Sequence, residues 1–281
     1  MIYITPHPGP WFDFCKRPEN ENLSLTEATL KYKKQVLLFE DGYSNFLFSK
    51  QMQQLSQGAK VNKNKPIVFI PLTKSELQTA VDLWVSDEPQ ALATYGEINT
   101  WVTTNITDMS FLFQAKGLFN SDISNWDVSN VTNMSAMFAT ANSFNQPIGN
   151  WNTSRVSDMS TMFFGNSSFN QPIGDWDVSN VTNILQMFAG SSPFQISPFD
   201  QPLNNWNVSS VINMETVFGF SAFNQPLDKW KVGSVTTMRS MFIGNALYNQ
   251  DLSFWDVNGV QDYENFDSNT PSWTLPKPNF V

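Results

Sequence analysis

A fixed order of apolar and polar positions recurs along residues 98–260, and its tryptophans mark the register. Successive tryptophans lie 25, 25, 25, 30, 24 and 25 residues apart. An Ile or Leu precedes each one by three residues, and further apolar residues follow at five, eight and twelve. A period of this length is typical of stacked repeats, each forming one coil. The seven tryptophans are Trp101, Trp126, Trp151, Trp176, Trp206, Trp230 and Trp255.

Within one repeat, the apolar spacing predicts a short strand followed by a short helix. The Ile/Leu-x-x-Trp segment is rich in strand-forming residues, so we expect it to be extended. The positions five, eight and twelve after the tryptophan, such as Val131, Met134 and Phe138, follow helical spacing. The pattern therefore predicts an α/β solenoid, in which short parallel strands and short helices stack in about seven coils.

Identical side chains are expected to lie above one another in such a stack. Trp on Trp, Met on Met and Phe on Phe would form ladders in the core. The asparagine of the recurring Phe-Asn-Gln segment can bond backbone groups of its own coil and of the next. Asp200 replaces this asparagine once. The asparagines at this position are Asn120, Asn145, Asn170, Asn224 and Asn249.

Before the repeats, the pattern predicts helices at 24–40 and about 43–57, and a short strand at 67–70. Thr73-Lys-Ser-Glu76 is a capping box, which opens a helix with Leu77 on its apolar face. A second short helix starts near Ser86 and ends at Gly96. We expect these helices to cover the exposed first coil.

This pattern divides the chain into four parts. Residues 1–65 form an N-terminal arm and helical region of unknown type. Residues 66–97 form a helical N-terminal cap of the solenoid. Residues 98–260 form the repeat solenoid, and residues 261–281 form a C-terminal cap or arm.

Candidate contacts with partner proteins lie where the repeat fails. Prolines interleave with aromatic residues at the N-terminus, which favours an extended arm. The unit of Trp176 carries a five-residue insertion, and insertions in stacked repeats form loops on one side, often the binding side. The C-terminal residues lose the pattern after Trp255. The candidate contacts are Trp11, Phe12, Phe14, Phe194, Ile196, Phe199, Trp273 and Phe280.

Charge is low and unevenly placed. Charged residues make up 15% of the chain, and the net charge is −9. Residues 98–281 carry six Lys/Arg and fourteen Asp/Glu, a net charge of −8. An acidic surface repels phosphate backbones, so we expect no nucleic-acid partner.

The sequence carries no catalytic motif, and we expect no metal, no cofactor and no enzymatic activity. Cys15 and His7 are the single cysteine and histidine, so a Cys/His metal site is not expected. Asp108 and Asp158 occupy a repeat position that other units fill with asparagine, such as Asn133. A turn needs only an acceptor there, whereas acid–base hydrolysis needs a pair of carboxylates.

No stretch approaches the ~18 consecutive apolar residues of a membrane span. The first residues also lack the basic region and apolar run of a secretory signal. The Asn-Val-Thr sequons at Asn130 and Asn180 lie inside the repeat, and we attribute them to the fold rather than to glycosylation.

The repeat W-[DN]-V-S-x-V-T-x-M-x-x-M-F, followed by F-N-Q-P, resembles the mycoplasma-lipoprotein-type, BspA-like leucine-rich-repeat family. Residues 126–150 carry the motif in full. The resemblance implies a leucine-rich-repeat-like solenoid that acts in adhesion or protein interaction, without catalytic residues. Such repeats occur on bacterial surface proteins, in marine algae and protists, and in large DNA viruses.

We therefore expect a non-enzymatic structural protein that contacts neighbouring subunits. Within that class we favour an assembly component of a large virus particle, a minor capsid-type protein located in the virion. The alternative is a cell-surface adhesin or extracellular ligand-binding repeat protein. A solenoid polysaccharide hydrolase is the third hypothesis.

Overall fold

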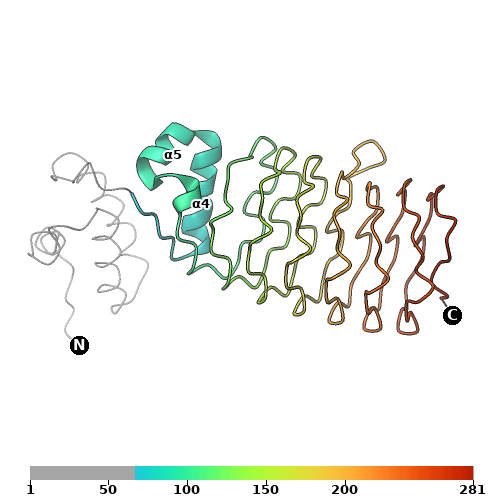
Figure 1. The fold of residues 1–281 in the computed structure, drawn as a ribbon. Helices are drawn as coiled ribbons and strands as arrows, with labels where there is room; N and C mark the ends of the chain where they lie inside the picture. Colours follow the sequence, from blue (N-terminus) through green and yellow to red (C-terminus); the bar gives the residue numbers. More distant parts are fainter. Residues whose placement is uncertain (1–66, 281) are drawn as a thin grey trace, which may run out of the picture.

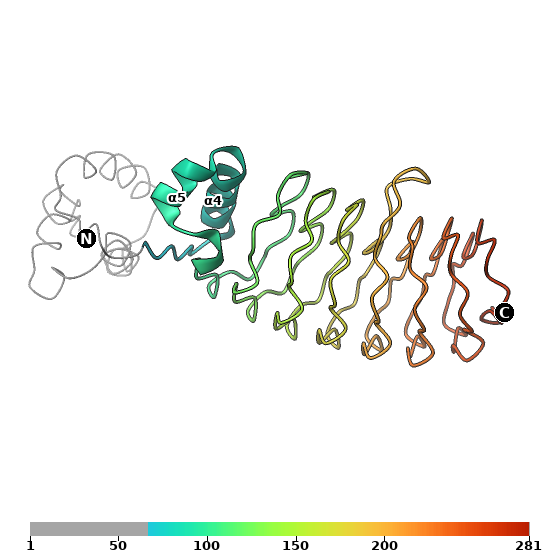
Figure 2. The same ribbon diagram turned by 45° about the horizontal axis from the view of Figure 1, so that its top comes forward.

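The structure, a computed structural model, describes residues 67–280 as a row of repeat units preceded by two α-helices (Figure 1). Helix α4 spans Lys74–Ser86, α5 spans Glu88–Tyr95, and the 3-10 helix η2 spans Ile98–Thr100. A repeat unit is defined here as the residues from one of the seven tryptophans to the residue before the next. The units follow one another from the helices to the C-terminal end (Figure 2).

The predicted fold class, a leucine-rich-repeat-like α/β solenoid with short parallel strands and helices, is wrong. Residues 67–280 contain no strand, and their two α-helices precede the repeats. Neighbouring units share only isolated parallel bridges, such as Asp108 with Asn133. The Ile/Leu-x-x-Trp segment is a turn, in which the amide of Trp126 donates to the carbonyl of Ile123 at 3.1 Å. The strand expected at 67–70 is also absent.

The helix expected within each unit is replaced by consecutive turns. The amides eight, ten, twelve and fourteen residues after each of the first six tryptophans donate to carbonyls of the following unit, four bonds at each of six junctions. The amide of Phe138, for example, donates to Met162 at 2.9 Å, whereas a helix would direct it to Met134. The intervening amides close turns inside the unit, as when Met137 donates to Met134. Every second amide is therefore used between units.

A residue in the left-handed backbone conformation occurs at the same position of every unit, within the segment in which the amide directions alternate. The residue ten after each tryptophan has a φ between 52° and 61°, and none of these residues is glycine. A left-handed conformation costs roughly 1 kcal/mol for a residue with a Cβ, so the bonds between units must offset this strain in every unit. The seven residues are Phe111, Ala136, Thr161, Gln186, Thr216, Ser240 and Asn265.

The predicted ladders are confirmed for the phenylalanine rings and for three pairs of tryptophan rings. The rings of Trp101 and Trp126 stack with centroids 6.1 Å apart, and those of Phe113 and Phe138 at 5.3 Å. A second phenylalanine ladder begins with Phe119, whose ring lies 4.1 Å from that of Phe113. These side chains are almost fully buried. Burying a phenylalanine contributes about 1.5–3 kcal/mol, so the ladders are a continuous source of stability along the stack.

The tryptophans also join the units through hydrogen bonds. The indole Nε1 of Trp126 donates to the carbonyl of Ile98, 28 residues earlier in η2, at 2.8 Å. Trp176, Trp206, Trp230 and Trp255 make the equivalent bond at 2.9–3.0 Å. Trp151 is the exception, since its buried Nε1 has no partner within residues 67–280.

The asparagine ladder predicted from Phe-Asn-Gln is confirmed as well. The Oδ1 of Asn145 accepts from the amide of Asn170 at 3.0 Å and from the side chain of Gln171 at 3.0 Å. Asp200 takes the same role, because its Oδ1 accepts from the amide of Asn224 at 2.8 Å. One side-chain oxygen thus satisfies two donors of the next unit.

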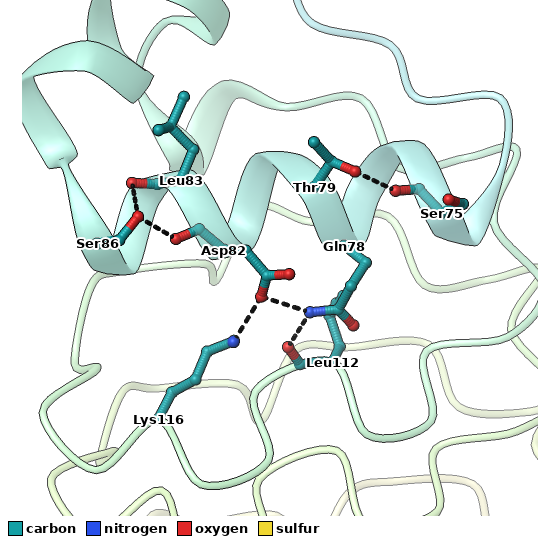
Figure 3. Close-up of polar contacts among 8 residues, drawn as sticks. All are labelled: Ser75, Gln78, Thr79, Asp82, Leu83, Ser86, Leu112 and Lys116. Carbon is teal, nitrogen blue, oxygen red and sulfur yellow. Dashed lines mark hydrogen bonds and ion pairs between the residues drawn. The ribbon is translucent and has the colours of Figure 1, made fainter.

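Helix α4 covers the first repeat unit. Thr73 caps it by accepting from the amide of Glu76, and Leu77, Ala80, Val81 and Trp84 are buried, so the predicted helix is confirmed. The side chain of Gln78 donates to the carbonyl of Leu112 at 3.1 Å (Figure 3). Lys116 of the first unit pairs with Asp82 of α4 at 2.6 Å (Figure 3).

Helix α5 begins after Asp87, whose carboxylate accepts from the amide of Gln90 at 3.1 Å. It ends at the predicted Gly96. The predicted helices at 24–40 and 43–57, and the arm and helical region at 1–65, lie outside the described residues.

Replacing Asn145 separates the hydrogen bonds of the asparagine ladder from simple packing. Asn145→Leu should lower the free energy of unfolding by about 1–3 kcal/mol, because the amide of Asn170 loses its acceptor. Asn145→Asp should change it by less than about 0.5 kcal/mol, since Asp200 shows that a carboxylate serves there. Urea unfolding measures both, and equal losses in the two variants would contradict this role.

Candidate interaction surface

The insertion in the unit of Trp176 is attached firmly at its base. The amide of Gly190 donates to the carbonyl of Gly219 at 3.0 Å, and that of Ser197 donates to Phe220 at 3.0 Å. The carbonyl of Ser197 in turn accepts from Ala222 at 2.8 Å. Both ends of the insertion are therefore tied to the following unit.

The tip of the insertion is a closed turn. The amide of Gln195 donates to the carbonyl of Ser192 at 3.1 Å, and the amide of Phe194 donates to the Ser192 hydroxyl at 3.3 Å. The side chain of Gln195 donates to the carbonyl of Gly165 in the preceding unit at 3.1 Å. The turn is thus held against the stack from both sides, and it projects beyond the row of units (Figure 2).

This turn presents an aromatic side chain to solvent. Phe194 is 98% exposed and Ile196 is 50% exposed. A fully exposed phenylalanine on a fixed support has a large apolar area to bury against a partner at little cost in conformational entropy. Residues 191–196 therefore form the candidate interaction surface, and we call them the insertion turn.

Two other candidate contact residues are part of the core instead. Phe199 is 1% exposed, and its ring stacks on Phe188 of the same unit at 4.0 Å and on Phe169 of the preceding unit at 6.1 Å. Trp273 is 5% exposed and lies edge-on to Tyr248 at 4.7 Å. Phe199 occupies the ladder position that precedes Asn-Gln elsewhere, so the sequence contained the signal for its burial.

The remaining candidates are divided between the C-terminal end and the undescribed N-terminus. The ring of Phe280 is partly buried and stacks on Tyr263 at 4.4 Å. Trp11, Phe12 and Phe14 lie outside residues 67–280. The structure therefore brings only Phe194 and Ile196 together on one exposed surface.

Exposed apolar residues also lie at positions that the sequence reasoning did not single out. Leu118 is 92% exposed and Phe254 is 75% exposed. The signal for Leu118 was its departure from the repeat, since Ser143 and Ser168 occupy the equivalent position. These residues are single and lie on different units, which is ordinary for a protein surface.

The repeated carboxylates serve the turns. The Oδ1 of Asp158 accepts from the amide of Ser160 at 2.8 Å, and Asn133 makes the same bond with Ser135 at 2.9 Å. Asp127 accepts in the same way from Ser129 at 3.0 Å. Aspartate and asparagine are thus equivalent acceptors at these corners, as the sequence predicted.

Electrostatics around several of these carboxylates hold them ionised. Hydrogen bonds from Ser129 lower the pKa of Asp127, and hydrogen bonds from Ser179 lower that of Asp177. Partial burial alone would raise the pKa of Asp108, but hydrogen bonds from Ser110 and the nearby Lys74 outweigh it. A general acid of a glycosidase requires the opposite shift.

Residues 67–280 contain neither a candidate metal-binding cluster nor a membrane-spanning helix. This part of the chain contains no group of three or more His, Cys, Asp or Glu side chains placed to hold a metal ion. None of its helices has the length and apolar character needed to cross a membrane.

The fold and its surface define a class of repeat protein built from turns. The family model described as "Mycoplasma protein of unknown function, DUF285" matches residues 88–198 and 194–276. The matched residues are more than half of the chain, and the protein belongs to this mycoplasma-type repeat family. Searches of curated proteins and of solved structures returned no match.

A substitution at Gly190 tests how the insertion turn is supported. A Cβ there would lie 2.4 Å from the carbonyl oxygens of Gln195 and Phe220, so Gly190→Ala should destabilise the protein by about 2 kcal/mol. Gly117→Ala is the matched control, because nothing lies within 4 Å of its Cβ. Thermal unfolding compares the two variants. Equal midpoints would show that the close approach at Gly190 is not needed.

Proposed function

We propose that this protein is a non-enzymatic structural and protein–protein interaction protein, in which the repeat stack supports the insertion turn. The observation that carries the proposal is the 98% exposure of Phe194 on a turn with a fixed base. Aromatic anchors of this kind supply much of the binding energy in protein interfaces when they enter a pocket. The partner surface should therefore contain an apolar pocket that accepts one aromatic ring.

The rigidity of the stack supports this proposal. Each junction between units combines four backbone bonds with stacked aromatic rings, so the spacing between units is fixed. A support that does not reorganise lowers the entropic cost of binding. The insertion turn lies on a single unit, which gives the partner one defined position along the row.

The charge of the repeats restricts the class of partner. A net charge of −8 over residues 98–281 disfavours nucleic acid and favours a neutral or basic protein surface. The low pKa values of Asp108, Asp127 and Asp177 do not favour the hydrolase hypothesis, which needs a protonated carboxyl group.

We further propose the finer assignment to the BspA-like repeats with the 25-residue W-D-V-S-x-V-T-x-M motif. The occurrence of such repeats in large DNA viruses favours an assembly component of a virus particle over a cell-surface adhesin. The two functions differ in the partner that Phe194 would meet, which is another particle subunit in the first and a host-surface molecule in the second.

The exposed phenylalanine provides the test. A photo-crosslinking amino acid at position 194 should give one discrete adduct in the native particle or on the native cell, and mass spectrometry would identify the partner. Phe194→Ser should weaken binding to that partner by about tenfold or more, the loss typical of a buried aromatic anchor.

Leu118→Ser is the control, since Leu118 is similarly exposed at 92% but lies on the first unit. Its affinity should equal that of the unsubstituted protein. If Phe194→Ser binds the partner as tightly as this control, the insertion turn is not the contact.

A further inference from the structure

One row of hydrogen bonds between repeat units runs in a single direction along the stack. At the last junction, the amides of Met238 and Ser240 donate to Asp262 and Glu264 at 2.8 Å each. The amides of Phe242 and Gly244 continue the row, donating to Phe266 and Ser268 at 2.8 and 2.7 Å. The other five junctions repeat this pattern in the same direction. Each unit therefore donates this row of bonds to the unit that follows it.

The last unit of residues 67–280 has the same row of donors, and no later unit within these residues receives it. Its equivalent amides belong to Tyr263, Asn265, Asp267 and Asn269, and none of these four has a hydrogen-bond acceptor within residues 67–280. Asn265 and Asn269 keep the left-handed conformation of the interior units, each with a φ of 58°. The four donors are therefore aligned as at every interior junction, and we call them the terminal edge.

At the opposite end of the stack, helix α4 contacts the first unit. There the side chain of Gln78 of α4 donates to the carbonyl of Leu112 in the first unit (Figure 3). Lys74 adds bonds to the side chains of Asp108, at 3.0 Å, and Ser110, at 2.5 Å. Within residues 67–280, the acceptor end of the stack is thus covered by α4, whereas the four amides of the terminal edge have no acceptor.

The C-terminal residues lie beside the terminal edge without satisfying it. Phe280 stacks on Tyr263, and Lys277 pairs with Asp267. No backbone carbonyl of residues 270–280 accepts from the four amides. Tyr263 is 41% exposed, and Asn265 and Asn269 are exposed as well. The edge is accessible from solvent.

The row of hydrogen-bond donors at the terminal edge determines which kind of ligand can bind there. The four amides of one terminal edge cannot bond to the four amides of another, because both rows are donors. The acceptor end of a second copy is blocked by α4. An extended peptide offers a carbonyl on the same side at every second residue, which matches donors placed at every second residue.

Charge adds a further restriction on the peptide. Asp262, Glu264 and Asp267 line the edge, and they outnumber the two cations that pair with them, Arg239 and Lys277. The whole repeat region carries a net charge of −8. We propose that the terminal edge binds an extended, Lys- or Arg-rich segment of a partner protein, which adds one layer to the end of the stack. This surface is separate from the insertion turn, so either site can fail without the other.

The test uses the full chain and amide hydrogen exchange measured by NMR. The probe is a capped twelve-residue peptide of alternating lysine and threonine. The amides of Tyr263, Asn265, Asp267 and Asn269 should exchange rapidly in the free protein and slow at least tenfold with this peptide. The matched peptide of alternating glutamate and threonine should leave them unprotected.

Two variants that each remove two negative charges separate edge binding from general attraction. Asp262→Asn with Glu264→Gln neutralises the edge while keeping the turn acceptor, as Asn133 does at the equivalent position. Asp158→Asn with Glu215→Gln makes the same changes at equivalent positions of interior units. The edge variant should bind the lysine peptide about fivefold more weakly, and the interior variant should bind it unchanged.

Several results would overturn the proposal. One is protection of the four amides in the free protein, and another is a lysine peptide that leaves them unprotected. Equal weakening in the edge and interior variants would reduce the effect to overall charge. Amides of interior units, such as Phe138, report in the same spectra that each variant is folded.

Discussion

The structure depends on a backbone in which successive amides point in different directions. Within each unit, one amide closes a turn and the next donates to the following unit, as Met137 and Phe138 do. This alternation requires left-handed residues at fixed places, such as Ala136 with a φ of 53°. The local strain is recovered only when a neighbouring unit accepts the bonds, so a unit gains its stability from the stack rather than from its own sequence.

Side chains then fix the spacing and the register. Stacked aromatic rings fill the interior. Each of the rings of Trp101, Phe113 and Phe119 stacks on the equivalent ring of the next unit. The asparagine ladder works at the corner of the unit, where one oxygen of Asn145 satisfies two donors of the next. Almost every consensus residue has a structural role, which leaves function to the places where the repeat changes.

The sequence was sufficient to predict the ladders and the polar corners, because both follow from identical residues at a fixed period. Helix α4 was also predictable, since Thr73 and Glu76 mark its start. The fold class could not be predicted correctly from spacing, because apolar residues at five, eight and twelve suit consecutive turns as well as a helix. The left-handed positions could not be recognised from the sequence, because residues such as Phe111, Ala136 and Gln186 occupy them instead of glycine. At the candidate surface, the exposure of Phe194 was predicted, whereas Phe199 was misread because the insertion obscured its ladder position.

NMR couplings across hydrogen bonds show directly whether turns joined by alternate amides replace the helix in each unit. We expect a coupling between the amide nitrogen of Phe138 and the carbonyl carbon of Met162, in the next unit. A coupling from Phe138 to the carbonyl carbon of Met134 would instead show an α-helix in each unit.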